Sequence, residues 1–248
     1  MATGVEVTGE HPVSGRFEDE TSAQLAQATV TATRSVRLVQ RGPVRDRSRA
    51  SQIEALLDLL SDYSPATYDH CRRVAALCHH LALGLGCTSD EVNAAFFAGL
   101  LHDIGKLVSP LVIIDKPAPL TDDERSTIEY HPVDGYRLIA HLIDDLRVTH
   151  AVLHHHERYD GRGYPVGTGT CIRITAIVAV ADAYDAMTHY HFYRSARSRQ
   201  QVVDEFRRGA GSQFAPEVVA ALFELIGATA ELADLCGWQQ PGRDPLAS

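Results

Sequence analysis

The spacing of apolar residues along the chain predicts helices. Between residues 51 and 60, SQIEALLDLL places four large apolar side chains on one stripe, as in a helix that buries one face: Ile53, Leu56, Leu57 and Leu60. Helical segments are also expected at 144–157, 171–188, 198–208 and 215–227. No stretch alternates apolar and polar residues for long enough to predict a sheet. We therefore expect an all-α fold.

Three patterns mark where helices begin. Ser64-Pro65 offers an N-cap and a first-turn proline to a helix that ends at Gly84 or Gly86. Thr88-x-x-Glu91 and Thr121-x-x-Glu124 are capping boxes, in which a threonine and a glutamate each bond the other's backbone N–H. They predict two further helices, the second of which is acidic and runs toward Tyr130.

Composition and charge narrow the function classes. The 248-residue chain is 45% hydrophobic and carries a formal net charge of -9, which argues against a binder of nucleic-acid polymers. Its longest apolar run, at 174–183, is interrupted by Asp182 and is shorter than the roughly 20 residues that span a bilayer, so no membrane segment is expected. Residues 1–20 lack the pattern of a secretory signal, which favours a cytoplasmic location.

The first fifty residues differ from the rest. Residues 1–50 are polar and charged, and we expect a flexible or partly helical leader with a short helix near 21–40. Their basic cluster is interpreted as a solvated face or as a partner-docking arm: Arg34, Arg37, Arg41, Arg45, Arg47 and Arg49. Residues 51–248 form the expected catalytic domain. The five cysteines are widely spaced without a CxxC pair, which predicts free, buried thiols.

Histidines and aspartates stand where a helical core would be apolar. In GLLHDIGK, the pair His102 and Asp103 follows the apolar run AAFFAGLL and must be carried inward with it. Burying such a pair without partners costs several kcal/mol for each group, and metal coordination is one way to satisfy it. Other candidate ligands come from separate helices: His70, His131 at the end of the acidic helix, His155, His156 and Asp182.

These donors are too many for one ion. Adjacent helical residues point about 100° apart, so the histidines at 154–156 cannot all face one metal, whereas two of them can, each on a different ion. Two ions that share Asp103 would use the whole set. Imidazole and carboxylate donors favour iron or manganese. Two such ions about 3.5 to 4 Å apart bridge a hydroxide and clamp phosphoryl oxygens, which suggests phosphoester hydrolysis with Lys106 meeting a phosphate oxygen.

The ordered motifs resemble those of the HD-GYP family. LLHDIGK followed by HHERYDGRGYP, together with His70 and His131, carries the likeness over residues 64–226. This family is the branch of the HD phosphohydrolase superfamily that hydrolyses cyclic di-GMP to pGpG or GMP. The resemblance implies an HD-type helical bundle with a GYP loop and additional C-terminal helices.

The resemblance also implies roles for individual residues. It implies two divalent ions, iron or manganese, on His70, His102, Asp103, His131, His155, His156 and Asp182, with Asp103 bridging. Asp103 and Lys106 would be the catalytic residues. The substrate contacts would be Lys106, Arg194, Gly163, Tyr164 and Pro165. The GYP loop would also contact a diguanylate cyclase partner, and the sequence leaves open whether the chain forms a homodimer.

Some positions depart from the family pattern. Members with a third metal carry a glutamate where this chain has Ala66, which favours a two-metal centre. The usual Arg-Pro-Tyr-Arg reads His191-Phe192-Tyr193-Arg194, so one phosphate-binding arginine is missing. Two alternatives therefore stay open: a hydrolase of another cyclic dinucleotide or nucleotide phosphoester, and a weakly active module that regulates a diguanylate cyclase.

Neighbouring residues are expected to support the centre. Glu157 and Asp185 are interpreted as structural carboxylates or as partners that orient ligating imidazoles. Gly161 and Gly163 are expected to adopt the positive φ angles that tight turns require.

Overall fold

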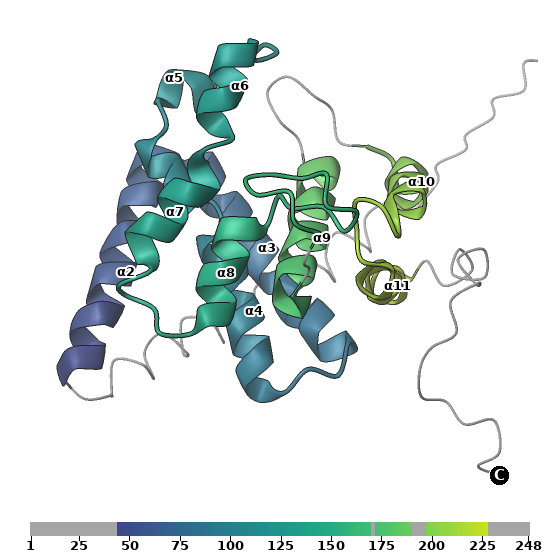
Figure 1. Ribbon diagram of the computed structural model, residues 1–248, viewed down its shortest axis with the longest axis horizontal. Coiled ribbons are helices and arrows are strands. Elements are labelled where there is room, and N and C mark those ends of the chain that lie inside the picture. Colours follow the sequence, from purple (N-terminus) through teal and green to yellow (C-terminus); the bar gives the residue numbers. More distant parts are fainter. Residues whose placement is uncertain (1–43, 170–171, 190–196, 228–248) are drawn as a thin grey trace, which may run out of the picture.

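The computed structural model describes residues 44–169, 172–189 and 197–227. These residues form helices, with one isolated bridge between Ala210 and Phe214 (Figure 1). The expected all-α fold is confirmed. The longer helices are α2 (Val44–Tyr63), α3 (Pro65–Gly84), α4 (Ser89–Leu101) and α9 (Arg173–Thr188). The shorter ones are the 3₁₀ helix η1 (Ile104–Val108), α5 (Leu111–Ile114), α6 (Asp122–Ile128), α7 (His131–Ile139), α8 (Leu146–His154), α10 (Arg199–Gly209) and α11 (Pro216–Leu225).

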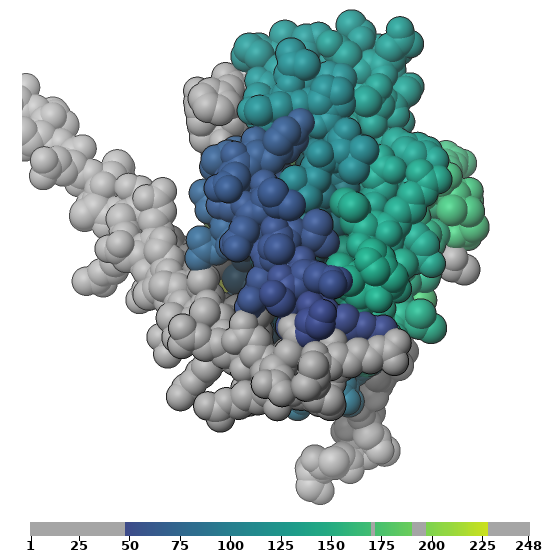
Figure 2. Space-filling view, turned by 90° about the vertical axis from the view of Figure 1, so that its left-hand side faces the viewer, coloured from purple at the N-terminus to yellow at the C-terminus, as the bar shows by residue number. Residues whose placement is uncertain are grey.

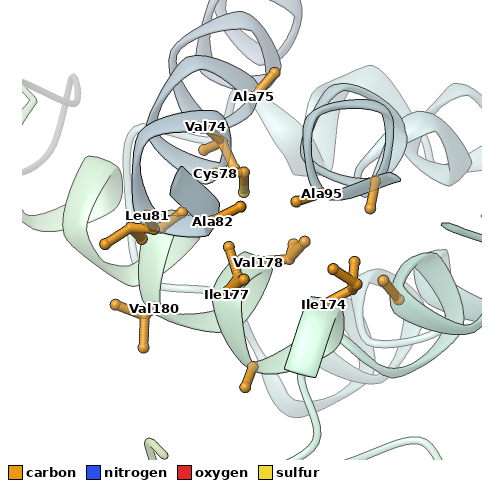
Figure 3. Close-up of a cluster of buried hydrophobic side chains, with 14 of the residues drawn as sticks. Val74, Ala75, Cys78, Leu81, Ala82, Ala95, Ile174, Ile177, Val178 and Val180 are labelled. Atoms are coloured by element: carbon orange, nitrogen blue, oxygen red, sulfur yellow. The ribbon is translucent and has the colours of Figure 1, made fainter. Parts of the chain in front are cut away.

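Helix α9 is the centre of the core. It packs against α3, α4 and α8 and also contacts α10 and α11, and Figure 1 shows it between α8 and the two C-terminal helices. A helix that is apolar around most of its circumference has to be buried in this way. In Figure 3, Ile177 and Val178 of α9 face Cys78 and Ala82 of α3, and all four side chains are fully buried.

The predicted helix starts are confirmed. The Ser64 hydroxyl accepts a hydrogen bond from the Thr67 N–H at the start of α3. Both capping boxes form, at Thr88 before α4 and at Thr121 before α6. Each satisfies N–H groups that the first turn of a helix leaves without an intrahelical partner. The sequence therefore sets these starts through local chemistry.

The region from 121 to 157 differs from expectation. The acidic helix ends at Ile128, and a separate helix, α7, begins at His131 with Pro132 in its first turn. Proline lacks the N–H that a helix interior needs but suits a first turn, so His131 begins a helix instead of ending one. The expected helix 144–157 is also shorter, because the Asp145 side chain caps α8 through the Arg147 N–H and the helix ends at His154. Helices α5 and α7 have no counterpart in the prediction.

Helix α2 covers one side of the bundle. Figure 2 shows it at the surface, with the α5–α6 segment above it. Its predicted stripe faces inward, since Leu60 is fully buried and Leu57 nearly so, whereas Leu59 on the opposite face is 57% exposed. The amphipathic pattern therefore fixes how α2 lies on the core.

Cys71 and Cys78 are free and buried as predicted, and Cys87 is free and half-buried. Cys171, Cys236, Arg194 and the expected helix near 21–40 lie outside the described residues. Among the helices that the structure describes, none combines the length and apolar character needed to cross a membrane.

Replacing a central side chain of α9 should destabilise the fold. We predict that Ile177→Ala lowers the free energy of unfolding by about 2 to 5 kcal/mol, because it removes buried methyl groups and leaves a cavity. Ile172→Ala, at a side chain that is 43% exposed, serves as the control and should change it by less than about 1 kcal/mol. Urea denaturation measures both values, and equal losses would contradict the central place of α9.

Candidate metal centre

The end of α4 carries His102 and Asp103 into the interior. Most residues of α4 are buried, His102 caps its C-terminus, and Asp103 stands immediately before η1. The exposed fractions of the two residues are 0% and 2%. Since an unpartnered buried charge is costly, the atoms around this pair determine what it can do.

Gly105 allows η1 to lie directly against α7. A Cβ atom at this position would overlap with the carbonyl oxygen of His131 and the amide nitrogen of Gly135. The close approach brings the Oδ1 atom of Asp103 to 3.1 Å from the Nε2 atom of His131. The glycine of the HDIGK motif is therefore needed for the spacing of the two elements.

Two groups of three side chains converge at this point. The first group is His70, His102 and Asp103, and the second group is His131, His155 and His156. Within each group the possible ligand atoms lie within 4.8 Å of one another. The expectation that His155 and His156 face different ions is wrong, because both belong to the second group. The regular helix ends at His154, so the spacing of successive helical residues does not govern His156.

The ring nitrogens of three histidines have fixed roles. In each, Nδ1 donates to the carbonyl oxygen three residues earlier, at 2.8 Å for His102, 2.6 Å for His131 and 2.9 Å for His155. A carbonyl can only accept, so Nδ1 carries a hydrogen in each ring, and Nε2 is the nitrogen that remains for partners in the two groups. These Nε2 atoms point inward, toward the partners of the two groups.

Pairs of Nε2 atoms come close together. The Nε2 atom of His102 lies 3.2 Å from that of His70, and the Nε2 atom of His131 lies 3.1 Å from that of His155. Two lone pairs at this separation repel each other unless a proton or a cation lies with them. Imidazole and carboxylate groups arranged in this way are the donors that divalent transition metals take in proteins, so the residues fit a metal ion.

Asp103 faces both groups. Its Oδ1 atom is directed to His131, whereas its Oδ2 atom lies 3.4 Å from the Nε2 atom of His102 and 3.7 Å from that of His70. The Oδ2 atom also accepts a hydrogen bond of 2.6 Å from the Nζ atom of Lys106. One carboxylate oxygen is thus available to each group, which is the arrangement that a bridging ligand needs.

Asp182 joins the first group. Its Oδ1 atom lies 3.1 Å from the Nε2 atom of His70 and 3.9 Å from that of His102. Burial alone would raise the pKa of Asp182, but the hydrogen bond from His70 and the charge near His102 hold it well below its usual range. Burial likewise opposes the charge of Asp103, and Lys106 and His102 hold its pKa well below normal. The first group therefore contains two ionised carboxylates that favour positive charge.

The second group is electrically different. Burial lowers the pKa of His155 well below its ordinary value and lowers that of His156 to about 3. In the first group burial also lowers the pKa of His70, but hydrogen bonds to Asp182 and Asp185 raise it to about 9 overall. Burial therefore favours the neutral forms of His155 and His156 in the second group, whereas the carboxylates around the first group favour the charged form of His70.

The GYP loop is held against the second group. The buried carboxylate of Glu157 accepts hydrogen bonds from the N–H groups of Val166 at 2.6 Å and Gly167 at 2.9 Å. The ring of Tyr164 stacks on that of His156, with ring centroids 4.8 Å apart, and the Tyr164-Pro165 peptide bond is cis. Glu157 therefore stabilises the loop, one of the two roles expected for it.

The two loop glycines have different tasks. Gly161 has a positive φ of 74°, as predicted. Gly163 does not, and the expectation for it is wrong. A Cβ atom at Gly163 would overlap with backbone atoms of His156 and Arg158, so the residue is glycine because two stretches of backbone lie in contact.

The seven predicted ligands and Lys106 come together, while Arg194 lies outside the described residues and its role stays a prediction. Asp185 supports the Nδ1 atom of His70, as expected for a partner that orients a ligand. Sequence reasoning missed Arg73, which binds Asp185. The signal was present in the spacing, since Arg73 follows His70 by three residues on one helix.

A sequence family described as "HD domain" matches residues 54–218. This span covers more than half of the chain and includes both groups of side chains.

The chain belongs to the HD domain family.

Curated relatives of this HD domain are phosphodiesterases by name. A 3'3'-cGAMP-specific phosphodiesterase 1 of Vibrio cholerae is 37% identical over 58% of this chain and 34% of its own length. The cyclic di-GMP phosphodiesterase response regulator RpfG of Xanthomonas campestris is 34% identical over 78% of this chain and 50% of its own. A cyclic di-GMP phosphodiesterase of Thermotoga maritima is 35% identical over 70% of this chain and 49% of its own length. The chain therefore spans about a third to a half of these relatives, and the resemblance seen in the motifs is confirmed.

Solved structures agree in fold. The HD domain of the L. monocytogenes phosphodiesterase PgpH, in complex with cyclic-di-AMP, covers 77% of this chain and all of that chain, with a TM-score of 0.52 and 18% identity. A cyclic GMP-AMP specific phosphodiesterase of V. cholerae covers 75% of this chain and 49% of its own, with a TM-score of 0.50 and 18% identity. At 18% sequence identity, the similarity to these structures supports the fold of this chain as an HD-type helical bundle.

Filling the contact at Gly105 should disturb the centre. We predict that Gly105→Ala lowers the free energy of unfolding by about 1 to 3 kcal/mol, because the added methyl group forces η1 away from α7. Gly84→Ala is the matched control, since a Cβ atom there meets nothing within 4 Å. Thermal unfolding followed by circular dichroism compares the two variants. A Gly105→Ala protein as stable as Gly84→Ala would show that the contact has room for a side chain.

Proposed function

We propose that this HD domain is a metal-dependent phosphodiesterase that hydrolyses cyclic di-GMP to pGpG or GMP. The observation that carries the proposal is the convergence of imidazole nitrogens and carboxylates in two adjacent groups. The names of the relatives supply the substrate class.

Two divalent ions, iron or manganese, fit the donors. His70, His102 and Asp182 would hold one ion, and His131, His155 and His156 would hold the other, with Asp103 shared between them. When bound, such a pair of ions lowers the pKa of a water molecule and neutralises charge on phosphoryl oxygens. The mixture of nitrogen and oxygen donors without thiolate supports iron or manganese.

The chain's own residues supply positioning and charge. Burial lowers the pKa of Lys106 but Asp103 raises it more, so the ammonium group remains charged. One of its hydrogens goes to Asp103, and two others are available to a phosphate oxygen of the substrate. In a site that excludes bulk water, such a preorganised cation stabilises the charge that develops during phosphoester cleavage.

The GYP loop borders the substrate in this proposal. Tyr164 stacks on His156 and so places the loop beside the second group. Tyr159 and Val166 flank the loop and are 42% and 57% exposed. Exposed apolar side chains next to the site support the predicted contact with a diguanylate cyclase, since such residues commonly mark interaction surfaces.

A second candidate substrate is 3'3'-cGAMP. It is favoured by the relative from Vibrio cholerae that carries this substrate in its name, at 37% identity. His191, in place of the usual arginine, is also consistent with altered phosphate recognition.

Removing the shared carboxylate should abolish turnover. We predict that Asp103→Asn, in the 248-residue chain purified anaerobically and loaded with Fe²⁺ or Mn²⁺, reduces cyclic di-GMP hydrolysis at least about 1,000-fold, or about 4 kcal/mol. An amide is neutral and cannot bridge two cations as a carboxylate does. Asp90→Asn, at an exposed position at the opposite end of α4, is the control and should retain wild-type turnover. Equal rates for the two variants would contradict the proposed centre.

A panel of substrates distinguishes the candidates. The loaded wild-type protein should cleave cyclic di-GMP faster than 3'3'-cGAMP and cyclic di-AMP, as judged by kcat/KM from chromatography of the products. Faster cleavage of 3'3'-cGAMP would assign that substrate instead. Tight metal binding without turnover of any of the three would favour the regulatory module and contradict the enzyme.

A further inference from the structure

His70 is held differently from its neighbours in the centre. The Nδ1 atoms of His102, His131 and His155 face backbone carbonyls, whereas that of His70 lies 2.7 Å from the Oδ2 atom of Asp185. A carboxylate carries a full negative charge, so it fixes the tautomer of an imidazole and makes the other ring nitrogen a stronger metal ligand. The support of His70 thus depends on a side chain from another helix.

Asp185 is itself held by Arg73. The Nε atom of Arg73 donates to Oδ1 at 2.8 Å, and its Nη2 atom donates to Oδ2 at 2.9 Å, a two-pronged contact that fixes the plane of the carboxylate. His189 lies 2.9 Å from the same Oδ1 atom. Asp185 is only 2% exposed, and its carboxylate oxygens find these partners inside the core.

The contacts join two helices in register. His70 and Arg73 are three residues apart on one face of α3, and Asp182 and Asp185 are three residues apart on one face of α9. His70 contacts both aspartates, and Arg73 contacts the second. A shift of α3 along α9 would break all of these contacts together, so Arg73 helps to set the position of the His70 ring.

We propose that Arg73 is a positioning residue for the metal ion of the first group. It touches no ligand atom of that ion and acts through Asp185 on His70. The proposal rests on the metal centre of the proposed function and adds that the two metal positions are unequal. In the second group, His131 and His155 are supported by backbone carbonyls of their own segments, so loss of Arg73 should weaken the binding of one ion and leave that of the other.

Manganese binding to the 248-residue chain tests the positioning role of Arg73. The wild type should bind two Mn²⁺ ions, and Arg73→Ala should weaken one of the two sites about 10- to 100-fold while the other changes less than about twofold. Calorimetric titration gives the two affinities. Electron paramagnetic resonance distinguishes a coupled pair of Mn²⁺ ions from a single ion, a signature that general destabilisation would not produce.

The neighbouring arginine is the matched control. Arg72 lies on the same helix, its side chain is 41% exposed, and it pairs with Asp69 outside the centre, so Arg72→Ala should bind both ions like the wild type. Arg73→Lys keeps the charge but loses the two-pronged contact, so the Mn²⁺ affinity of its weakened site should lie between those of Arg73→Ala and the wild type. If Arg73→Ala does not fold, as judged by its circular dichroism, Arg73→Gln is measured by the same criteria.

The outcomes separate the two proposals. A wild-type protein that binds fewer than two Mn²⁺ ions at saturation would overturn the dinuclear centre and, with it, the role of Arg73. Two ions in the wild type, with equal weakening of both sites or with no weakening in the Arg73 variant, would overturn the role of Arg73 alone. A loss of Mn²⁺ affinity that is confined to one site in Arg73→Ala and absent from Arg72→Ala supports the role of Arg73.

Discussion

The centre depends on ionised carboxylates inside a helical core, where charge needs compensation. Asp103 is almost wholly buried, and its two oxygens face different groups of imidazoles. Lys106 supplies one positive charge at 2.6 Å, and the other neighbours of Asp103 are imidazole nitrogens. A bundle built only to be stable would place apolar residues here, because they fill the same space without a desolvation cost. The arrangement is therefore best explained by what it binds.

The two groups also differ in how much of their geometry is local. His102, His131 and His155 take their support from carbonyls three residues away, so their ring orientations are set as soon as the nearby backbone forms. His70 and Asp182 reach each other only when α3 packs on α9. The pairing of His70 with Asp182 is thus a product of tertiary packing, whereas the ring orientations of His102, His131 and His155 are set by local backbone structure.

Much of the fold and of the centre could be predicted from the sequence, for identifiable reasons. Capping at Ser64, Thr88 and Thr121 is local chemistry, and the side chains that come together at the candidate metal centre were found because HDIGK and HHERYDGRGYP occur in order. The break before His131 was missed although Pro132 signals it. Close contacts between stretches of backbone could not be predicted, because nothing in the sequence says that Gly105 lies against α7 or Gly163 against residues 156–158.

The hydrogen bonds of Glu157 have a consequence for how this domain can change. Glu157 directly follows the ligand pair at 155–156, and its carboxylate receives the backbone of the loop at Val166 and Gly167. The acceptor belongs to the ligand segment, while the donors are main-chain groups that any sequence can supply. The loop can therefore exchange its side chains without losing the hydrogen bonds that tie its backbone to the segment of His155 and His156.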